Sequence, residues 1–258
     1  HKGVWFTFTP PVTGSYTISS CQSDAAGSTV SDNILGIYTS AAGCAGTFTE
    51  VICDDDGCTT LGLQALATTT LNCGTTYYIL VSAYNTSTGD VQLKVTAPTC
   101  TVAAFNVTGG GTYCAGGSGV SVGLSGSAPC TNYQLFRGAT PLNTLAGTGS
   151  TLDFGLQTVA GNYTVVATNA TFGACTGTMT GSATVSIQAQ PNAGTNGTLT
   201  ICVNALAVNL TTGSPEAGTW ADPSDAPHSG TFMPGTDAAG VYTYTVNATT
   251  PCVGSVSA

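Results

Sequence analysis

The sequence predicts an all-β protein built from tandem β-sandwich modules that are stapled by disulfide bonds. The tetrapeptide Gly-x-Tyr-Thr occurs at residues 14–17, 161–164 and 240–243, and each copy opens a run of alternating apolar and polar residues. Such alternation is typical of a half-buried strand, and Gly supplies the turn before it. The Tyr of each copy is expected to pack at a sheet corner with its hydroxyl group hydrogen-bonded. No stretch has convincing amphipathic helical spacing.

Composition supports this prediction. Charged residues make up only 6% of the 258 residues, and apolar residues make up 42%. A soluble cytosolic domain usually carries about 25% charged residues, so the polar surface here must consist of Thr, Ser, Asn and Gly. The apolar content and the repeated alternation argue against a disordered chain.

The first predicted module covers residues 1–99 and is jelly-roll-like. Turn signals such as the Asp54-Asp55-Asp56-Gly57 segment separate its expected strands. These strands lie at residues 3–9, 14–20, 33–39, 47–53, 61–69, 75–83 and 90–97.

Two immunoglobulin-like modules are predicted to follow, at residues 100–189 and 190–258. In the second module, strands at 133–137 and 163–167 are expected to face each other across a sandwich. In the third, strands are expected at residues 199–202, 218–220 and 241–246. The third module is shorter than the ~100 residues of a usual immunoglobulin-like sandwich, so it is expected to be truncated.

Both ends of the sequence are expected to be cut from a longer chain, which would leave open sheet edges at residues 3–9 and 241–247. An open edge presents unpaired backbone groups that can accept another strand. Completion by the same chain is favoured over a strand donated by a neighbouring copy, because it avoids the entropy cost of association.

Charge and hydropathy exclude two classes of partner. The net charge is −9, and Lys and Arg total 3. Such a chain has no electrostatic surface for nucleic acid or for anionic lipid. No apolar run approaches the ~20 residues of a membrane-spanning helix, so membrane insertion is not expected.

Eleven cysteines without closely spaced ligand pairs predict disulfides in an oxidising compartment rather than zinc sites. Cys44 and Cys53 flank one hairpin and are the simplest bridge, and the third module holds only two cysteines. The odd count leaves Cys73 for a partner upstream of this segment, or as a free thiol. The predicted pairs are Cys44 with Cys53, Cys21 with Cys58, Cys100 with Cys130, Cys114 with Cys175, and Cys202 with Cys252.

Residues 1–97 resemble the bacterial pre-peptidase C-terminal domain, a β-sandwich appended to secreted peptidases and surface proteins. The resemblance rests on the order of five motifs, and the strand that usually precedes the first of them is absent. The motifs are Val-Trp-Phe-Thr-Phe-Thr at 4–9, Gly-Ser-Tyr-Thr at 14–17, Asp-Asn-Ile-Leu-Gly-Ile-Tyr at 32–38, Cys-Asp-Asp-Asp at 53–56 and Thr-Tyr-Tyr-Ile-Leu-Val at 76–81.

Residues 100–258 resemble the immunoglobulin-like repeats of large surface and adhesion proteins of Bacteroidetes. The supporting segments are 113–120, 132–136, 218–220 and 240–246. This resemblance implies a long multidomain chain exported to the bacterial cell surface, and it supplies no catalytic residue.

The acidic residues Asp32, Asp54, Asp55 and Asp56 are the candidate metal ligands. Ca²⁺ takes six to eight oxygen ligands, which neighbouring carboxylates and loop carbonyls can provide. Some domains of the first resembled family bind calcium, which strengthens this hypothesis. The spacing lacks the ligand set of an EF-hand, and a solvated acidic turn is the alternative reading.

Catalytic chemistry is not expected. A Ser-His-Asp triad would need His1 or His228, and His228 is predicted to lie in a turn-rich loop. Trp5 lies among other apolar residues and is predicted to be in the core, and Trp220 is predicted to be the buried Trp of a sandwich. An exposed aromatic platform for sugars is the alternative for both tryptophans.

The sequence therefore predicts a non-enzymatic segment of a secreted or cell-surface structural or adhesive protein, such as a stalk, fibre or filament. Its expected partners are other copies or neighbouring domains of the same surface protein, or a glycan or another ligand on a host or cell surface. The alternative is the accessory tail of a secreted hydrolase that binds calcium or a glycan.

Overall fold

The computed structural model describes residues 3–59, 62–169 and 175–258. It confirms the all-β prediction, since these residues form strands and a single short 3-10 helix, η1 (Gly43–Ala45). None of the described helical structure is long and apolar enough to cross a membrane.

The chain divides into two compact units. The first consists of His1–Val107, Leu124–Leu152 and Thr164–Gly181, and the second of Thr108–Gly123, Asp153–Tyr163 and Ser182–Ala258. The border between the units passes through strands in the middle of the chain. It does not coincide with the module borders expected near residues 99 and 189, which stay predictions.

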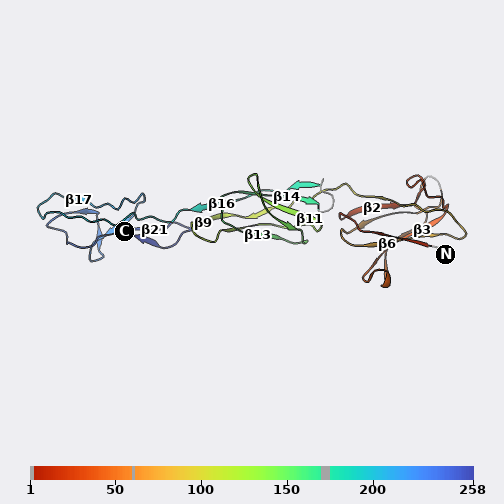
Figure 1. The fold of residues 1–258 in the computed structure, drawn as a ribbon, viewed down its shortest axis with the longest axis horizontal. Coiled ribbons are helices and arrows are strands. Elements are labelled where there is room, and N and C mark those ends of the chain that lie inside the picture. The colour runs from red at the N-terminus through yellow and green to blue at the C-terminus, as the bar shows by residue number, and fades with distance from the viewer. Residues whose placement is uncertain (1–2, 60–61, 170–174) are drawn as a thin grey trace. The chain divides into compact units, whose positions relative to one another are not determined.

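Two sheets at the N-terminal end of the first unit form a sandwich, drawn red to orange in Figure 1. One sheet has the order β1-β6-β3-β4 and the other has the order β5-β2-β7. Their strands are β1 (Gly3–Phe8), β2 (Gly14–Ser19), β3 (Asn33–Ser40), β4 (Phe48–Asp54), β5 (Leu66–Leu71), β6 (Tyr77–Ala83) and β7 (Lys94–Thr96).

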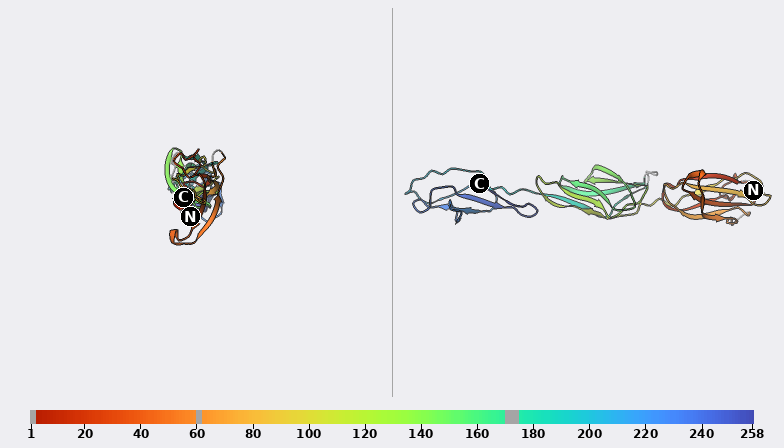
Figure 2. Two further views of the ribbon diagram at one scale, coloured as in Figure 1. Left: turned by 90° about the vertical axis from the view of Figure 1, so that its right-hand side faces the viewer. Right: turned by 90° about the horizontal axis from the view of Figure 1, so that it is seen from below.

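Alternate residues of both sheets fill the core of this sandwich. Tyr16 and Ile18 on β2 pack with Leu35 and Ile37 on β3, and each is at most 1% exposed. Phe6 on β1 packs against the same cluster from the edge of its sheet. The view from below in Figure 2 shows these strands in two layers. Strands β1–β6 are six to eight residues long, so each sheet presents several inward side chains to the other.

The middle of the chain forms two further sheets, with the orders β13-β10-β8 and β12-β11-β14-β16-β9. Strand β15 pairs with β14, and β9 runs parallel to β16. The strands are β8 (Val107–Gly109), β9 (Gly111–Cys114), β10 (Val120–Leu124), β11 (Thr131–Arg137), β12 (Thr140–Ala146), β13 (Leu152–Gln157), β14 (Gly161–Asn169), β15 (Thr176–Thr178) and β16 (Ala183–Gln188).

The sheet order corrects one prediction. The strands expected at 133–137 and 163–167 correspond to β11 and β14, which are neighbours in one sheet and do not face each other across a sandwich. Tyr133 and Leu135 on β11 are fully buried, as are Val165 and Ala167 on β14. The same alternation arises for neighbouring strands and for facing strands, so the sequence pattern does not distinguish the two arrangements.

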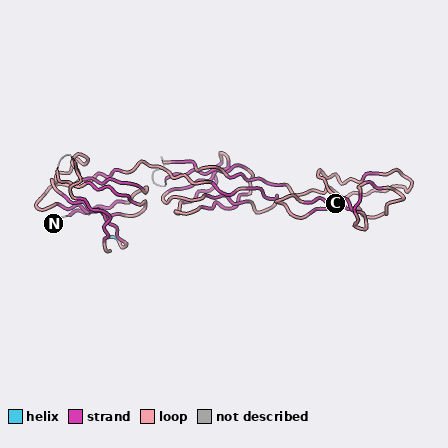
Figure 3. Tube along the Cα trace, turned by 180° about the vertical axis from the view of Figure 1, so that it is seen from behind, coloured by secondary structure: helices cyan, strands magenta, loops and turns pink. Residues whose placement is uncertain are grey.

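The C-terminal part of the second unit has shorter strands, and Figure 3 shows that loops make up most of it. It contains two small sheets with the orders β17-β20 and β19-β18-β21-β22. The strands are β17 (Val208–Asn209), β18 (Thr219–Ala221), β19 (Pro227–His228), β20 (Thr231–Phe232), β21 (Thr243–Asn247) and β22 (Ser255–Ser257).

Two expectations for this part change. Residues 199–202, predicted as a strand, form none, and Leu199 is 49% exposed. The edge expected at residues 241–247 is not open over β21, because β18 pairs with one side of this strand and β22 of the same chain pairs with the other. At the other end of the chain, β1 is an edge strand of its sheet.

The three Gly-x-Tyr-Thr copies form the predicted tyrosine corners. The Tyr16 hydroxyl donates a 2.9 Å hydrogen bond to the Val12 carbonyl oxygen. Tyr163 donates to the carbonyl four residues before it at 2.7 Å, and Tyr242 does the same at 2.9 Å. Each bond ties the start of a strand to the loop that leads into it. The motif therefore specifies the same local geometry in all three places.

Candidate functional site

Four disulfides join eight of the eleven cysteines and indicate an oxidising compartment. The predicted bridge between Cys21 and Cys58 is confirmed. The other bridges are Cys73–Cys130, Cys100–Cys175 and Cys114–Cys252. Cys44, Cys53 and Cys202 are free and exposed.

The predicted bridge between Cys44 and Cys53 is wrong because the hairpin separates the two residues. Cys44 lies in η1 at the tip of the hairpin, whereas Cys53 lies near the far end of β4 opposite Gly36. Strand residues rise by ~3.4 Å each, so the five steps from Phe48 to Cys53 span ~17 Å. A disulfide needs a Cα–Cα distance of about 4.4–6.8 Å.

The predicted pairs Cys100–Cys130 and Cys114–Cys175 are also wrong. The Val107 backbone N–H donates to the Thr180 carbonyl, and the Thr180 N–H donates to the Phe105 carbonyl. These bonds place the segment that follows Cys100 beside the segment that follows Cys175, so these two cysteines pair. Cys130 instead pairs with Cys73, which therefore needs no partner outside this segment.

The predicted pair Cys202–Cys252 is replaced by Cys114–Cys252. Strand β9 runs parallel to β16, which places Cys114 opposite Gln188. The Cys252 sulfur lies 3.5 Å from the Ala189 carbonyl oxygen, so both partners reach the C-terminal end of β16. Cys202 lies in a segment without strands and stays exposed.

Three of the four predicted metal ligands lie together. One carboxylate oxygen from each of Asp32, Asp55 and Asp56 lies within 4.8 Å of the others. Burial raises the pKa of Asp32 above its ordinary value, and the charges of Asp55 and Asp56 raise it further. Three carboxylates supply up to six oxygens, so this donor set fits a calcium ion.

Asp54, the fourth predicted ligand, is not part of this group and has a different role. Its Oδ1 atom accepts hydrogen bonds from the Gly57 backbone N–H at 2.9 Å and from the Leu66 N–H at 2.8 Å. It thereby holds the turn after β4 against the start of β5. The side chain satisfies two backbone donors that would otherwise need water.

His228 is the described histidine on which a catalytic triad would depend. It lies in the two-residue strand β19 rather than in a loop. Its Nδ1 atom accepts the Gly230 N–H at 3.1 Å, and its Nε2 atom lies 3.4 Å from the Asp237 carboxylate. Both ring nitrogens are therefore engaged, and this pair holds the loop between residues 228 and 237. His1 lies outside the described residues.

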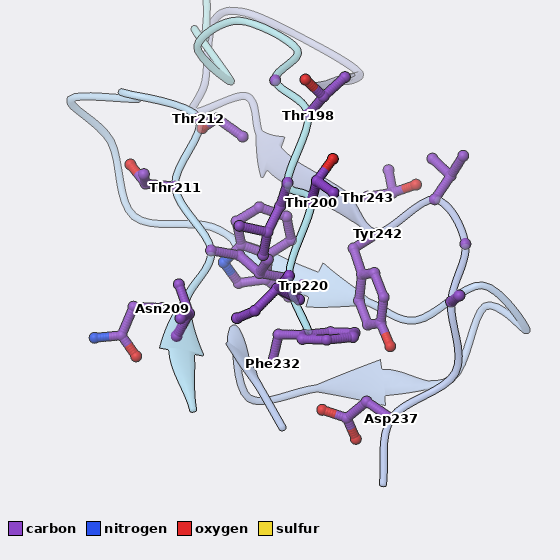
Figure 4. A pocket seen from close by; sticks show the side chains of 18 of the residues that line it. Thr198, Thr200, Asn209, Thr211, Thr212, Trp220, Phe232, Asp237, Tyr242 and Thr243 are labelled. Atoms are coloured by element: carbon purple, nitrogen blue, oxygen red, sulfur yellow. The ribbon is translucent and has the colours of Figure 1, made fainter. Parts of the chain in front are cut away.

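A cavity of about 1200 Å³ lies among the short strands of the C-terminal part. Figure 4 shows the rings of Trp220, Phe232 and Tyr242 gathered in it, with Asp237 beside the Tyr242 side chain. Trp220 packs on Tyr244 at 5.0 Å between ring centres but is only partly buried. The prediction of a buried sandwich Trp is therefore only partly met, because the cavity occupies the space that a closed core would fill.

Four aromatic rings gather on the sheet β1-β6-β3-β4, one from each strand. Trp5 stacks on Phe48 at 4.8 Å between ring centres, and Tyr38 lies 5.7 Å from Trp5. Tyr78 contacts Phe48 edge-on at 5.2 Å. The core prediction for Trp5 is wrong, since its side chain is 47% exposed. Phe6 points inward, so Trp5, the residue directly before it on the same strand, must point outward.

The free thiol of Cys53 borders these rings. Burial raises the pKa of Cys53, and the charges of Glu50, Asp54 and Asp55 raise it further. The thiolate is the nucleophilic form of cysteine, so this environment disfavours reactivity.

No family model matches the chain, and no curated protein matches it.

Proposed function

We propose that this chain is a non-enzymatic segment of an exported structural or adhesive protein, in which disulfides bind successive β-sandwich modules to one another. The observation that supports the proposal is the position of two bridges. Cys73–Cys130 connects the first predicted module to the second, and Cys114–Cys252 connects the second to the third. A bacterial cell surface is the proposed location, and neighbouring modules or copies of the same protein are the proposed partners.

The bridges shorten the covalent path through the chain. This path runs to Cys21, crosses to Cys58, continues to Cys73, crosses to Cys130, runs back to Cys114 and crosses to Cys252. It contains about 60 residues, or about 200 Å of fully extended chain, whereas the whole sequence extends to about 900 Å. A protein under tension could therefore extend to only about 200 Å even if its sheets came apart.

The remaining bridge acts differently. Cys100–Cys175 encloses a separation of 75 residues but lies off this shortest path. It is expected to stabilise the region it encloses by restricting the unfolded chain, with little effect on the maximum extension. Its removal is thus a matched control for the two bridges that connect modules.

Single-molecule stretching of the chain between its ends tests the proposal. The oxidised protein should reach a contour length of about 200 Å, and the reduced protein about 900 Å. A Cys100→Ser/Cys175→Ser variant should keep the short limit, whereas a Cys73→Ser/Cys130→Ser variant should exceed it. An oxidised wild-type chain that extends as far as the reduced one would contradict the proposal.

A further inference from the structure

The outward face of the sheet β1-β6-β3-β4 carries a continuous group of aromatic side chains, which we call the aromatic platform: Trp5, Tyr38, Phe48 and Tyr78. The rings contact one another in sequence at 4.8–6.2 Å between centres. The inward face of the same sheet is filled by Leu35, Ile37 and other core residues. The platform is therefore additional to the core.

Gly36 shapes the platform. A Cβ atom at this position would lie 2.5–2.8 Å from the outer atoms of the Tyr38 ring. The ring therefore lies directly over the glycine, which is fully within the buried part of β3. This arrangement holds the Tyr38 ring against the sheet, so that the surface of the platform stays flat and accessible.

Polar groups are interleaved with the rings. Glu50 pairs in register with Tyr38, so its carboxylate lies on the same face of the sheet. The Tyr38 phenol is a hydrogen-bond donor at neutral pH, and its pKa is raised by burial and further by the charge of Glu50. Carboxylate acceptors and phenolic donors beside aromatic faces match the hydroxyl groups and the C–H faces of a sugar.

Charge restricts the class of sugar. Of the three basic residues, Lys94 lies on β7 of the other sheet and Arg137 on β11, so neither described base lies on the platform. The chain as a whole carries a net charge of −9. An anionic glycan would be repelled by Glu50 and would find no described cation to pair with.

The exposed area argues against a protein partner. An aromatic side chain buries about 150–250 Å² when it is fully covered, and these four rings are already half-buried or more. Together they offer roughly 300–400 Å², whereas a stable protein interface takes ~800 Å² from each partner. A sugar chain a few residues long requires no larger surface.

We propose that the aromatic platform binds a neutral glycan, with Trp5 and Phe48 stacking on sugar rings and Glu50 and Tyr38 contacting sugar hydroxyls. This binding activity goes beyond the proposed mechanical role and does not depend on the bridges that connect modules. If experiment contradicts the glycan-binding proposal, the proposed mechanical role can still be tested, and the reverse also holds.

Native affinity electrophoresis of the full oxidised chain tests the proposal, with gels that contain soluble neutral β-glucan, mannan, xylan or galactan, and alginate as an anionic control. At least one neutral polysaccharide should retard the wild-type protein, and alginate should not. Trp5→Ala and Phe48→Ala should each weaken retardation roughly tenfold or more, as expected for a central aromatic contact.

Two variants separate the platform from general effects on folding. Gly36→Ala keeps all four rings but forces Tyr38 off the sheet, so it should weaken retardation as well. Tyr84→Ala removes an exposed ring that lies just beyond β6, outside the platform, and should leave retardation unchanged. Thermal melting of each variant would confirm that it folds.

Four results would overturn the proposal. The first is the absence of retardation by every neutral polysaccharide, and the second is retardation by alginate alone. The third is unchanged retardation in both folded variants, Trp5→Ala and Phe48→Ala. Capture of a protein that depends on Trp5, without any retardation by a glycan, would also overturn it.

Discussion

The first and the third tyrosine corners make the same hydrogen bond in very different surroundings. Tyr16 is 1% exposed, contacts Phe8 at 5.4 Å and belongs to the core of the N-terminal sandwich. Tyr242 is only partly buried, contacts Phe232 at 5.6 Å and lines the cavity of the C-terminal part. The motif therefore fixes a turn and a hydroxyl contact, but it does not by itself build a core.

The difference follows from strand length. Tyr16 lies on a six-residue strand, and the opposite sheet contains strands of up to eight residues. Around Tyr242, the strands β17, β19 and β20 are two residues long. A two-residue strand presents only one side chain to each face, so facing sheets of this length cannot exclude solvent.

Truncation of the two tyrosines should reveal this difference most strongly. Tyr16→Ala should lower the free energy of unfolding of its sandwich by about 3–5 kcal/mol, because it removes a fully buried ring. Tyr242→Ala should cost about 1 kcal/mol, because its ring already borders a cavity. Urea denaturation of both variants measures the effect. Equal losses would show that the two corners are packed alike.

Removal of the hydroxyl group alone should lower the free energy of unfolding by less than truncation to Ala does. The loss should again be larger at Tyr16 than at Tyr242. Tyr16→Phe leaves the Val12 carbonyl without its partner in a part-buried position, and should cost about 1–2 kcal/mol. Tyr242→Phe should cost about 0.5 kcal/mol or less, because water can reach the Ala238 carbonyl. A larger loss from Tyr242→Phe than from Tyr16→Phe would reverse the comparison.

Two aspartates extend the comparison to electrostatics. Burial, together with the charges of Asp55 and Asp56, raises the pKa of Asp32. Hydrogen bonds from the Ser224 hydroxyl and from the Ala226 and Ser224 backbone N–H groups lower the pKa of Asp222. When a carboxyl group has a higher pKa in the folded state than in the unfolded state, the free energy of unfolding falls as pH rises through the folded-state pKa. A lowered pKa means that stability is lost as pH falls through it.

Substitutions of these aspartates should therefore act in opposite directions. At neutral pH, Asp32→Asn should raise the melting temperature and Asp222→Ala should lower it. Both differences should shrink at about pH 3, where the carboxyl groups of the unfolded chain are largely protonated. Melting curves at neutral pH and at about pH 3 show whether each substitution raises or lowers the melting temperature. A destabilising effect of Asp32→Asn at neutral pH without added metal would contradict the account of this cluster.

Calcium should have the smallest effect, confined to the N-terminal sandwich. If the three clustered carboxylates bind the ion, millimolar calcium should slightly raise the melting temperature of the wild type but not that of Asp32→Asn. An Asp237→Asn variant is the control, because this residue lies in the C-terminal part. No shift in the wild type would leave the cluster as a solvated acidic surface.

The sequence predicted the features that depend on neighbouring residues. Alternation located β2, β14 and β21, and the position of Gly before Tyr-Thr predicted each corner. The same alternation could have placed Trp5 correctly, since its neighbours Val4 and Phe6 cannot share its face. Its apolar character outweighed this signal and led to the wrong assignment.

Features that depend on distant residues could not be predicted in this way. Cys100 and Cys175 meet because of backbone bonds between the segments that follow them, and Cys114 reaches Cys252 because β9 runs parallel to β16. Neither pairing is visible in the spacing of cysteines. The grouping of four rings on one sheet likewise required the strand order β1-β6-β3-β4.

Peptide mapping under non-reducing conditions tests the central claim most directly. Digestion and mass spectrometry of the oxidised protein should yield linked peptides that contain Cys73 with Cys130 and Cys114 with Cys252. Cys44, Cys53 and Cys202 should react with an alkylating reagent once the chain is unfolded. Linked peptides that instead join Cys100 to Cys130, Cys114 to Cys175 and Cys202 to Cys252 would contradict the disulfide connection between modules.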